Sequence, residues 1–522
     1  MATESFERFS QKVLGEIYSG RERCRVETEA TLPDYKEAAL SILRADARCS
    51  VTRQTLSLQG QSLVCEVEGS VHLHVLYLTE RQGEKGVPSS FSVTEPMNHT
   101  VRIPLKGQVD PGEIDAFLDL KAQSVYPKLL GPRRIHLRCE MDLDLTLKKN
   151  TELFLYSDPP LSSVHLKKRP VRMASLVSVC REEIDFSETI SLPKAYRSIG
   201  ELCEMNVDLF SKSCTPQEGG VRIAGSCDLC CTYVSEEEEE LVSFYQPVEF
   251  EKSIGIPECT PDLIPSIHLA PRLLKAVTDV NEEGENKNVF FELVVTAEIR
   301  LYRNDFCEVP EDAFCEDAEL ILEEEETGCE ELLRSQEFTQ SEKGSISSSD
   351  VPERIEALRW NTEFKNSYLE SDGIVLEGRV DLCFLSLRSD GELIPTERAL
   401  DFKTKIPADL SEIPEDARDL RIEVCGGVRA LDLVPRDGGL EARFEVCGTV
   451  LVFCRHRFVN LSSMKIGEAL PEKGRGICFF YPQKNDTLWT LCKEAGVSPE
   501  AVCLENGLEA ADPLPRVLHV TR

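Results

Sequence analysis

The sequence has no apolar run long enough to cross a membrane. No stretch of its 522 residues approaches the roughly twenty consecutive apolar residues of a membrane span. The first twenty residues interleave charged and apolar side chains, with charges at Glu4, Glu7, Arg8, Lys12 and Glu16. They therefore lack the continuous apolar segment of a secretory signal. We expect the chain to stay in the compartment that made it.

Basic residues are scarce relative to acidic ones. The chain has 59 lysines and arginines against 92 aspartates and glutamates, which gives a formal net charge of −33 at pH 7. A charge of this sign and size repels phosphate backbones and anionic lipid surfaces. We therefore expect no nucleic-acid partner.

The sequence also lacks the common motifs of catalysis and cofactor binding. It has no G-x-x-x-x-G-K-[ST] phosphate loop, no G-x-G-x-x-G after a predicted strand, no H-E-x-x-H and no G-x-S-x-G. His72 and His74 share a face of one predicted strand, which could begin a metal site. No third ligand is visible, and we interpret them as surface histidines. We predict a protein that is not an enzyme and that uses no cofactor or metal.

The number of cysteines, 21, is odd, and the chain is long and has no export signal. These features argue against a disulfide framework. Many of the cysteines fall at apolar strand positions, where a thiol packs as a small hydrophobic side chain. Cys227 and Cys230 have a metal-like spacing, but in a strand they point to opposite faces. We predict reduced cysteines and no zinc site.

What the sequence does contain is an internal repeat centred on a strand glycine. The segments around Gly69, Gly225 and Gly378 align with one another, 156 and 153 residues apart. A second element that ends in Ile-Pro follows each segment, at Ile103-Pro104, Ile256-Pro257 and Ile406-Pro407. A period of this length indicates a domain rather than a solenoid unit. The shared glycine predicts a bulge or a close backbone approach in a sheet.

Apolar and polar residues alternate within each repeat, as at 137–147, 291–301 and 440–446. A period of two with one buried face is typical of antiparallel sheets. The sequence therefore predicts a mainly β protein with three tandem antiparallel β-sandwich-like domains. Their predicted bounds are 1–160 with an N-terminal helical lead-in, 161–305, and 306–460 with an acidic, serine-rich lead-in.

Residues 308–350 are rich in glutamate and serine, yet apolar residues such as Leu320 and Leu322 are spaced among them. We interpret this stretch as a solvated connection between domains that contains some ordered elements. The alternative is a strip that docks a partner.

The last fifty residues predict a small module of strand, helix, helix and strand over 474–522. Asp486 is a candidate N-cap of the first helix, which ends at Gly496, and Ser498-Pro499 begins the second helix. Strand-like runs at 477–481 and 517–520 flank the two helices. The apolar stripe of the first helix falls at Leu488, Leu491, Cys492 and Ala495.

The segment Asp486-Thr487-Leu488-Trp489, with Asn506 after it, resembles the LysM domain. Members of that family bind N-acetylglucosamine-containing glycans or, in some intracellular settings, protein partners. Asn485 stands where the family usually has glycine, and Pro515-Arg516 stands where it has Gly-Gln, so the resemblance supports the fold better than sugar binding. It implies a partner or glycan site at Asp486, Thr487, Leu488, Trp489, Asn506, Leu508 and Asp512.

The glycine-centred strand followed by a segment that ends in proline resembles the SPOCS domain of sporulating Firmicutes. Three such domains ahead of one LysM domain is the arrangement of the SipL-type spore-coat scaffolds of clostridia. The resemblance implies a scaffold in the mother-cell cytoplasm, at the surface of the developing forespore, that binds the coat basement-layer morphogenetic ATPase. The alternatives are a peptidoglycan-binding protein that acts through the LysM domain and a glycan hydrolase with an unrecognised active site.

Overall fold

The computed structural model describes residues 6–80, 86–105, 110–158, 161–347, 352, 354–388, 391–409, 419–436, 438–471, 476–484, 486–509 and 512–521. Strands dominate this part of the chain, and all of their pairings are antiparallel. The prediction of a mainly β chain with antiparallel sheets is confirmed. Neither α-helix within the described residues is long and apolar enough to span a membrane.

Three successive sets of six strands have the same topology, and we call them the first, second and third repeats. The first contains β1 (Arg8–Thr31), β2 (Ala39–Gln59), β3 (Ser62–Thr79), β4 (Pro88–Pro104), a 3-10 turn (Pro111–Glu113), β5 (Asp115–Gly131) and β6 (Arg134–Tyr156). The second contains β7 (Val164–Ser191), β8 (Ile199–Gln217), β9 (Gly220–Ser235), β10 (Leu241–Gly255), β11 (Ile264–Asp279) and β12 (Asn288–Cys315). The third contains β13 (Ala318–Ser347), β14 (Arg354–Glu370), β15 (Gly373–Leu387), β16 (Leu393–Pro407), β17 (Leu420–Arg436) and β18 (Gly439–Ala469).

Each repeat forms two three-stranded sheets with one shared core between them. In the first repeat the sheets have the orders β1-β6-β5 and β2-β3-β4, and the other two repeats follow the same scheme. The alternation along each strand builds this core, because every second side chain points inward. Val75 of β3 and Leu143 of β6, for example, are fully buried in the same cluster.

Each of the three repeat glycines lies where its strand approaches the backbone of the neighbouring strand closely. A Cβ atom on Gly69 would sit 2.3 Å from the Ser50 carbonyl oxygen, and one on Gly225 would sit 2.5 Å from the Phe210 carbonyl oxygen. The pairing register shifts beside the partner of each glycine, on β2, β8 and β14. The prediction of a bulge and a close backbone approach is confirmed.

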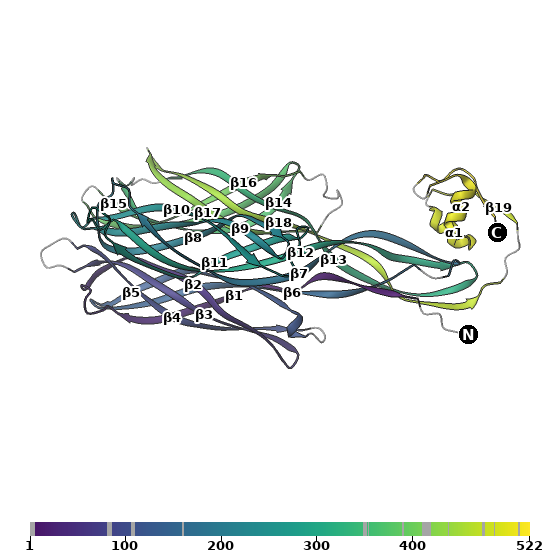
Figure 1. Cartoon of the computed structure of the whole chain (residues 1–522), viewed down its shortest axis with the longest axis horizontal. Coiled ribbons are helices and arrows are strands. Elements are labelled where there is room, and N and C mark those ends of the chain that lie inside the picture. The colour runs from purple at the N-terminus through teal and green to yellow at the C-terminus, as the bar shows by residue number, and fades with distance from the viewer. Residues whose placement is uncertain are drawn as a thin grey trace.

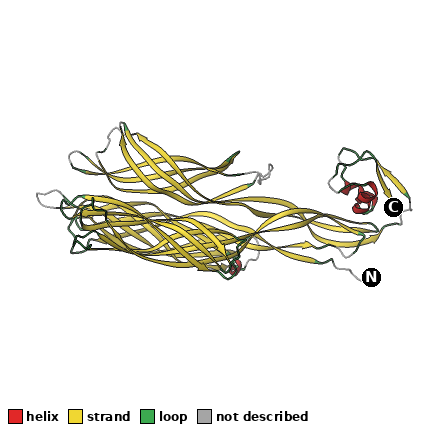
Figure 2. Ribbon diagram, turned by 45° about the horizontal axis from the view of Figure 1, so that its top comes forward, coloured by secondary structure: helices red, strands yellow, loops and turns green. Residues whose placement is uncertain are grey.

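The repeats close into a ring around a central axis. The last strand of one sheet contacts the first strand of the corresponding sheet in the next repeat, β4 with β8 and β10 with β14, and β16 returns to β2. Beyond this ring, the long strands β1, β6, β7, β12, β13 and β18 run together into a narrow stalk, as Figures 1 and 2 show. The stalk has a core of its own, to which these six strands contribute Val13, Leu155, Val171, Met173, Cys307, Val309, Cys329 and Phe458.

Two predictions about the lead-in segments are wrong. The expected N-terminal helical lead-in is strand β1, which pairs with β6 in an antiparallel sheet. The expected connection at 308–350 forms the end of β12 and then β13, apart from residues 348–350, which lie outside the described residues. Its glutamates at 323–326 are exposed on a paired strand. The predicted boundary between residues 305 and 306 therefore falls inside β12.

A small module follows the third repeat. It contains β19 (Ile477–Phe480), α1 (Leu488–Ala495), α2 (Pro499–Asn506) and β20 (Leu518–Thr521), with β19 and β20 paired. This order of strand, helix, helix and strand is the predicted one. The module lies at the far end of the stalk (Figure 1).

Candidate functional site

The start of α1 differs by one residue from the prediction. Thr487, not Asp486, is the N-cap: its hydroxyl accepts from the Thr490 N–H at 3.1 Å, and the Thr490 hydroxyl accepts from the Thr487 N–H at 2.9 Å. The Asp486 carboxylate instead accepts from the Gln483 N–H at 2.7 Å. The helix begins at Leu488, so the residue directly before it has the extended backbone that capping requires.

The other predicted signals of the module agree with the structure. Gly496 ends α1 in a left-handed conformation with φ of 64°. Ser498 caps α2 ahead of Pro499. On the inner face of α1, Leu491, Cys492 and Ala495 are buried, and Leu488 packs against them while partly exposed.

Trp489 points out of the module toward the stalk. Its indole N–H donates to a carboxylate oxygen of Asp312 at 2.7 Å, and its ring meets Phe314 edge to face with centroids 5.0 Å apart. Lys493, one turn along α1, donates to the other oxygen of Asp312 at 2.7 Å. Asp312 and Phe314 both belong to β12. Trp489 therefore joins the module to the second repeat.

The remaining predicted residues lie around the end of α2. The Asn506 amide bridges to β20, donating to the His519 carbonyl at 2.7 Å and accepting from the His519 N–H at 2.8 Å. This use is structural. Leu508 packs partly buried against the module core, and Asp512 is exposed and accepts from the Glu509 N–H. Among the described residues, no hydrogen bond connects Asp486 or Thr487 with Leu508 or Asp512.

One face of β19 is open and apolar. The exposed fractions of Ile477, Phe479 and Tyr481 are 66%, 54% and 67%. The intervening Cys478 and Phe480 pack against the module core. Exposed apolar side chains gathered in this way are typical of surfaces that contact other proteins.

A second site, which the sequence did not reveal, is a cluster of charges at the ring axis. It consists of Arg44, Asp46, His74, Glu204 and Arg359, and we call it the axial cluster. Its members come from β2, β3, β8 and β14, and therefore from all three repeats. The interpretation of His74 as a surface histidine is wrong, because its side chain is only 12% exposed.

Hydrogen bonds in the axial cluster tie the repeats to one another. Arg44 of the first repeat donates to Glu204 of the second and to the Ala357 carbonyl of the third. Arg359 of the third repeat donates to Glu204 at 3.2 Å. The Ala357 carbonyl is turned toward the axis by a bulge in β14, where Ala357 itself has φ of 49°.

Asp46, His74 and Glu204 lie close enough together to suggest a metal site, since one ligand atom of each falls within 4.8 Å of the others. Their charges are already balanced, however. Arg44 lies 2.6 Å from Asp46 and also pairs with Glu204, and Arg359 adds a second cation. Burial raises the pKa of Glu204, but Arg359 and Arg44 outweigh that effect and hold it well below its ordinary value. Two guanidinium groups occupy the place of a cation, so we interpret the cluster as structural.

A cavity of about 1340 Å³ adjoins the axial cluster and is lined by all three repeats. Arg48 and Asp208 face it from β2 and β8. Burial raises the pKa of Asp208 to about 6, with Arg359 and Arg48 opposing that shift. The cavity thus extends the charged region of the axial cluster, with lining residues from all three repeats.

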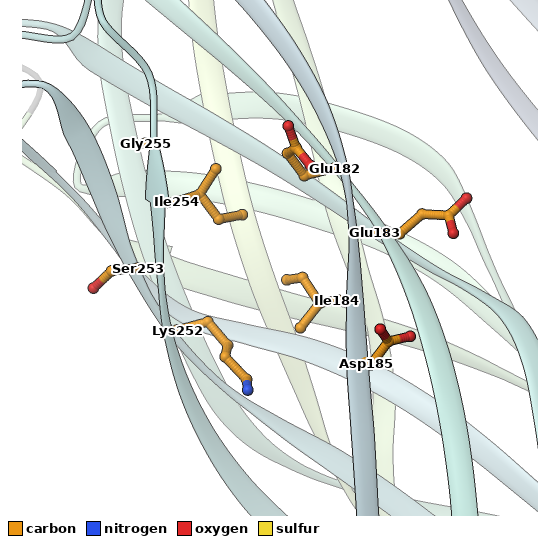
Figure 3. Close-up of a pocket in the computed structure, with 8 residues that line it drawn as sticks. All are labelled: Glu182, Glu183, Ile184, Asp185, Lys252, Ser253, Ile254 and Gly255. Carbon is orange, nitrogen blue, oxygen red and sulfur yellow. The ribbon is translucent and has the colours of Figure 1, made fainter.

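A pocket of about 560 Å³ lies between β7 and β10 of the second repeat. Figure 3 shows Ile184 and Ile254 between the two strands and Glu183 on the outer side of β7. Glu182 and Glu183 are neighbours on one strand and point to opposite faces, so they cannot converge on one ligand. We interpret the pocket as the open edge between the two sheets of this repeat.

No protein-family model matches the sequence, and no curated protein matches it.

Proposed function

We propose that the chain is a non-enzymatic scaffold in endospore formation. In this proposal it is a SipL-type protein that binds the coat basement-layer morphogenetic ATPase through its C-terminal module. It acts in the mother-cell cytoplasm and helps to tether the coat to the forespore surface.

The observation that carries the proposal is the order of parts. Three repeats of identical strand topology precede one small β-α-α-β module. This order agrees with three SPOCS domains followed by a LysM domain, which is what the sequence resemblance implies. The axial cluster adds support, because charges buried between repeats suit a rigid body that carries a binding module at the end of its stalk.

Two observations favour a protein partner over a glycan. The strip formed by Ile477, Phe479 and Tyr481 is apolar and exposed, as in protein-contact surfaces. The net charge of −33 also disfavours anionic polymers as partners.

The proposal is tested by offering the purified chain two ligands in parallel. We expect it to co-purify with the coat ATPase and to stay in the supernatant when peptidoglycan is sedimented. Sedimentation with peptidoglycan, without binding to the ATPase, would replace the proposal with the glycan-binding alternative. Release of soluble muropeptides would instead indicate a hydrolase.

A further inference from the structure

The tip of β12 forms a small acceptor site for α1. Asp312 presents both carboxylate oxygens, one to the Trp489 indole and one to the Lys493 ammonium, each at 2.7 Å. Phe314 is 5% exposed and belongs to the same buried cluster as the inner face of α1. His165 covers its other side, with ring centroids 5.0 Å apart.

Two features fit this site to α1. Trp489 and Lys493 are four residues apart on a helix, so they project from one face and reach the same carboxylate together. The register of β12 shifts between Pro310 and Asp312, and a bulge of this kind re-aims the side chains beside it. Partial burial raises the pKa of Asp312, but the hydrogen bonds from Lys493 and Trp489 outweigh that effect and hold the pKa below its ordinary value. The carboxylate is therefore charged when it accepts from α1.

A short connection in the chain also keeps α1 close to Asp312 and Phe314. The Leu470 N–H donates to the Asp317 carbonyl at 2.8 Å, which ties the end of the third repeat to the turn between β12 and β13. Only residues 471–476 separate that point from β19. A tether of this length spans at most about 20 Å and gives an effective concentration in the millimolar range. A contact of a few side chains is then enough to keep the module docked.

From this arrangement we propose that Asp312 and Phe314 form an intramolecular latch that covers the Trp489 face of the module. While the latch is closed, a partner cannot reach that face. Docking to the stalk and binding of a partner at Trp489 exclude each other, so the latch sets how much of the protein is competent to bind. This last step rests on the proposed function and on the LysM resemblance, which implies that Trp489 belongs to the partner site.

The latch is tested first without any partner. The chain has two tryptophans, so a Trp360→Phe background leaves Trp489 as its only indole emitter. In that background Asp312→Ala should raise the acrylamide quenching constant of Trp489 at least twofold, because the indole loses its acceptor. Lys493→Met should raise it less, and Lys484→Met, outside the contact, should leave it unchanged. An equal quenching constant in the parent, Asp312→Ala and Lys493→Met proteins would overturn the latch.

The second measurement is the affinity of the purified coat ATPase for the same full-length proteins. Loss of two charge-assisted hydrogen bonds should lower the equilibrium constant for docking of the module by at least about tenfold. The apparent affinity should rise by up to the same factor, because it scales with the competent fraction. Equal or weaker binding of Asp312→Ala would overturn the gating and leave the proposed function standing. No binding by any variant, with the quenching change intact, would overturn the proposed function together with the gating.

Discussion

Replacing Arg44 by methionine should destabilise the whole ring. The side chain is 2% exposed and makes contacts in all three repeats, with Asp46, Glu204 and the Ala357 carbonyl. Methionine fills similar space but removes the donor to the Ala357 carbonyl and leaves the buried Glu204 carboxylate with Arg359 as its remaining arginine partner. Removing one partner from a buried ion pair typically costs about 3–5 kcal/mol, and we expect a loss in that range.

This loss can be converted into a shift of melting temperature. At about 2.1 cal/mol/K per residue, a ring and stalk of roughly 460 residues have an unfolding entropy on the order of 1 kcal/mol/K. If the three repeats unfold together, Arg44→Met should lower the melting temperature by about 3–5 °C in a single transition. If the repeats unfolded separately, the melting temperature of one repeat of roughly 150 residues would fall by about 10–15 °C, while the transitions of the other repeats would stay in place.

Differential scanning calorimetry distinguishes these cases, with Arg23→Met as the matched control. Arg23 is 92% exposed and lies 3.8 Å from Asp142, and an exposed ion pair of this kind contributes about 0–1 kcal/mol. A shift in Arg44→Met no larger than in Arg23→Met would refute the structural role of the axial cluster. Two separated transitions would refute the closed ring as one cooperative body.

The pH dependence of the same variant gives an independent check. The folded pKa of Glu204 is lowered from an ordinary value of 4.5 by its arginine partners, against the effect of burial. Such a group contributes stability that is present above pH 4.5 and is lost as the pH falls through its folded value. The difference in stability between the parent and Arg44→Met should therefore narrow below pH 4.5, and an unchanged or wider difference would contradict this assignment.

Three further predictions follow from buried groups elsewhere. Lys148 is 1% exposed and donates to Glu423, which also pairs with Arg421. Because Glu423 keeps Arg421 as a partner, Lys148→Met should leave the free energy of unfolding unchanged or raise it by up to about 4 kcal/mol. A clear loss of stability in urea denaturation would contradict this prediction. Gly69→Ala should be destabilising because its Cβ would lie 2.3 Å from a carbonyl oxygen, whereas Gly131→Ala meets nothing within 4 Å; equal effects of the two on the denaturation midpoint would count against the close approach. All 21 cysteines are free thiols in the structure, so titration after denaturation under alkylating conditions should find nearly all of them, and several stoichiometric disulfides would disprove this.

Local signals in the sequence were sufficient to predict the strands and the order of elements in the C-terminal module. Alternation along 137–147 marks β6, and Gly496 and Ser498 mark the helix ends, because each signal depends on a few neighbouring residues. The same rules failed at Asp486, where two adjacent residues could cap α1 and only the backbone decides between them. They also failed at 308–350, where exposed glutamates hide a strand that is held by its partner β18.

Contacts between distant parts of the chain could not be predicted. The axial cluster joins Arg44 to Glu204 and to the Ala357 carbonyl, which are separated by more than a hundred residues of sequence. No local pattern marks an arginine that will be buried between repeats. The contact of Trp489 with Asp312 is equally remote, and the apolar stripe of α1 gave no indication of it.

The central claim is that the C-terminal module is the partner-binding end of a scaffold. The most direct measurement is the affinity of the purified coat ATPase for the full-length chain and for a chain that ends at residue 473. The truncation leaves the three repeats and the Leu470 bond to Asp317 intact. We predict tight binding to the full-length chain and its loss on truncation, with an unchanged calorimetric transition of the repeats. Undiminished binding to the truncated chain would contradict the account and place the partner site on the repeats.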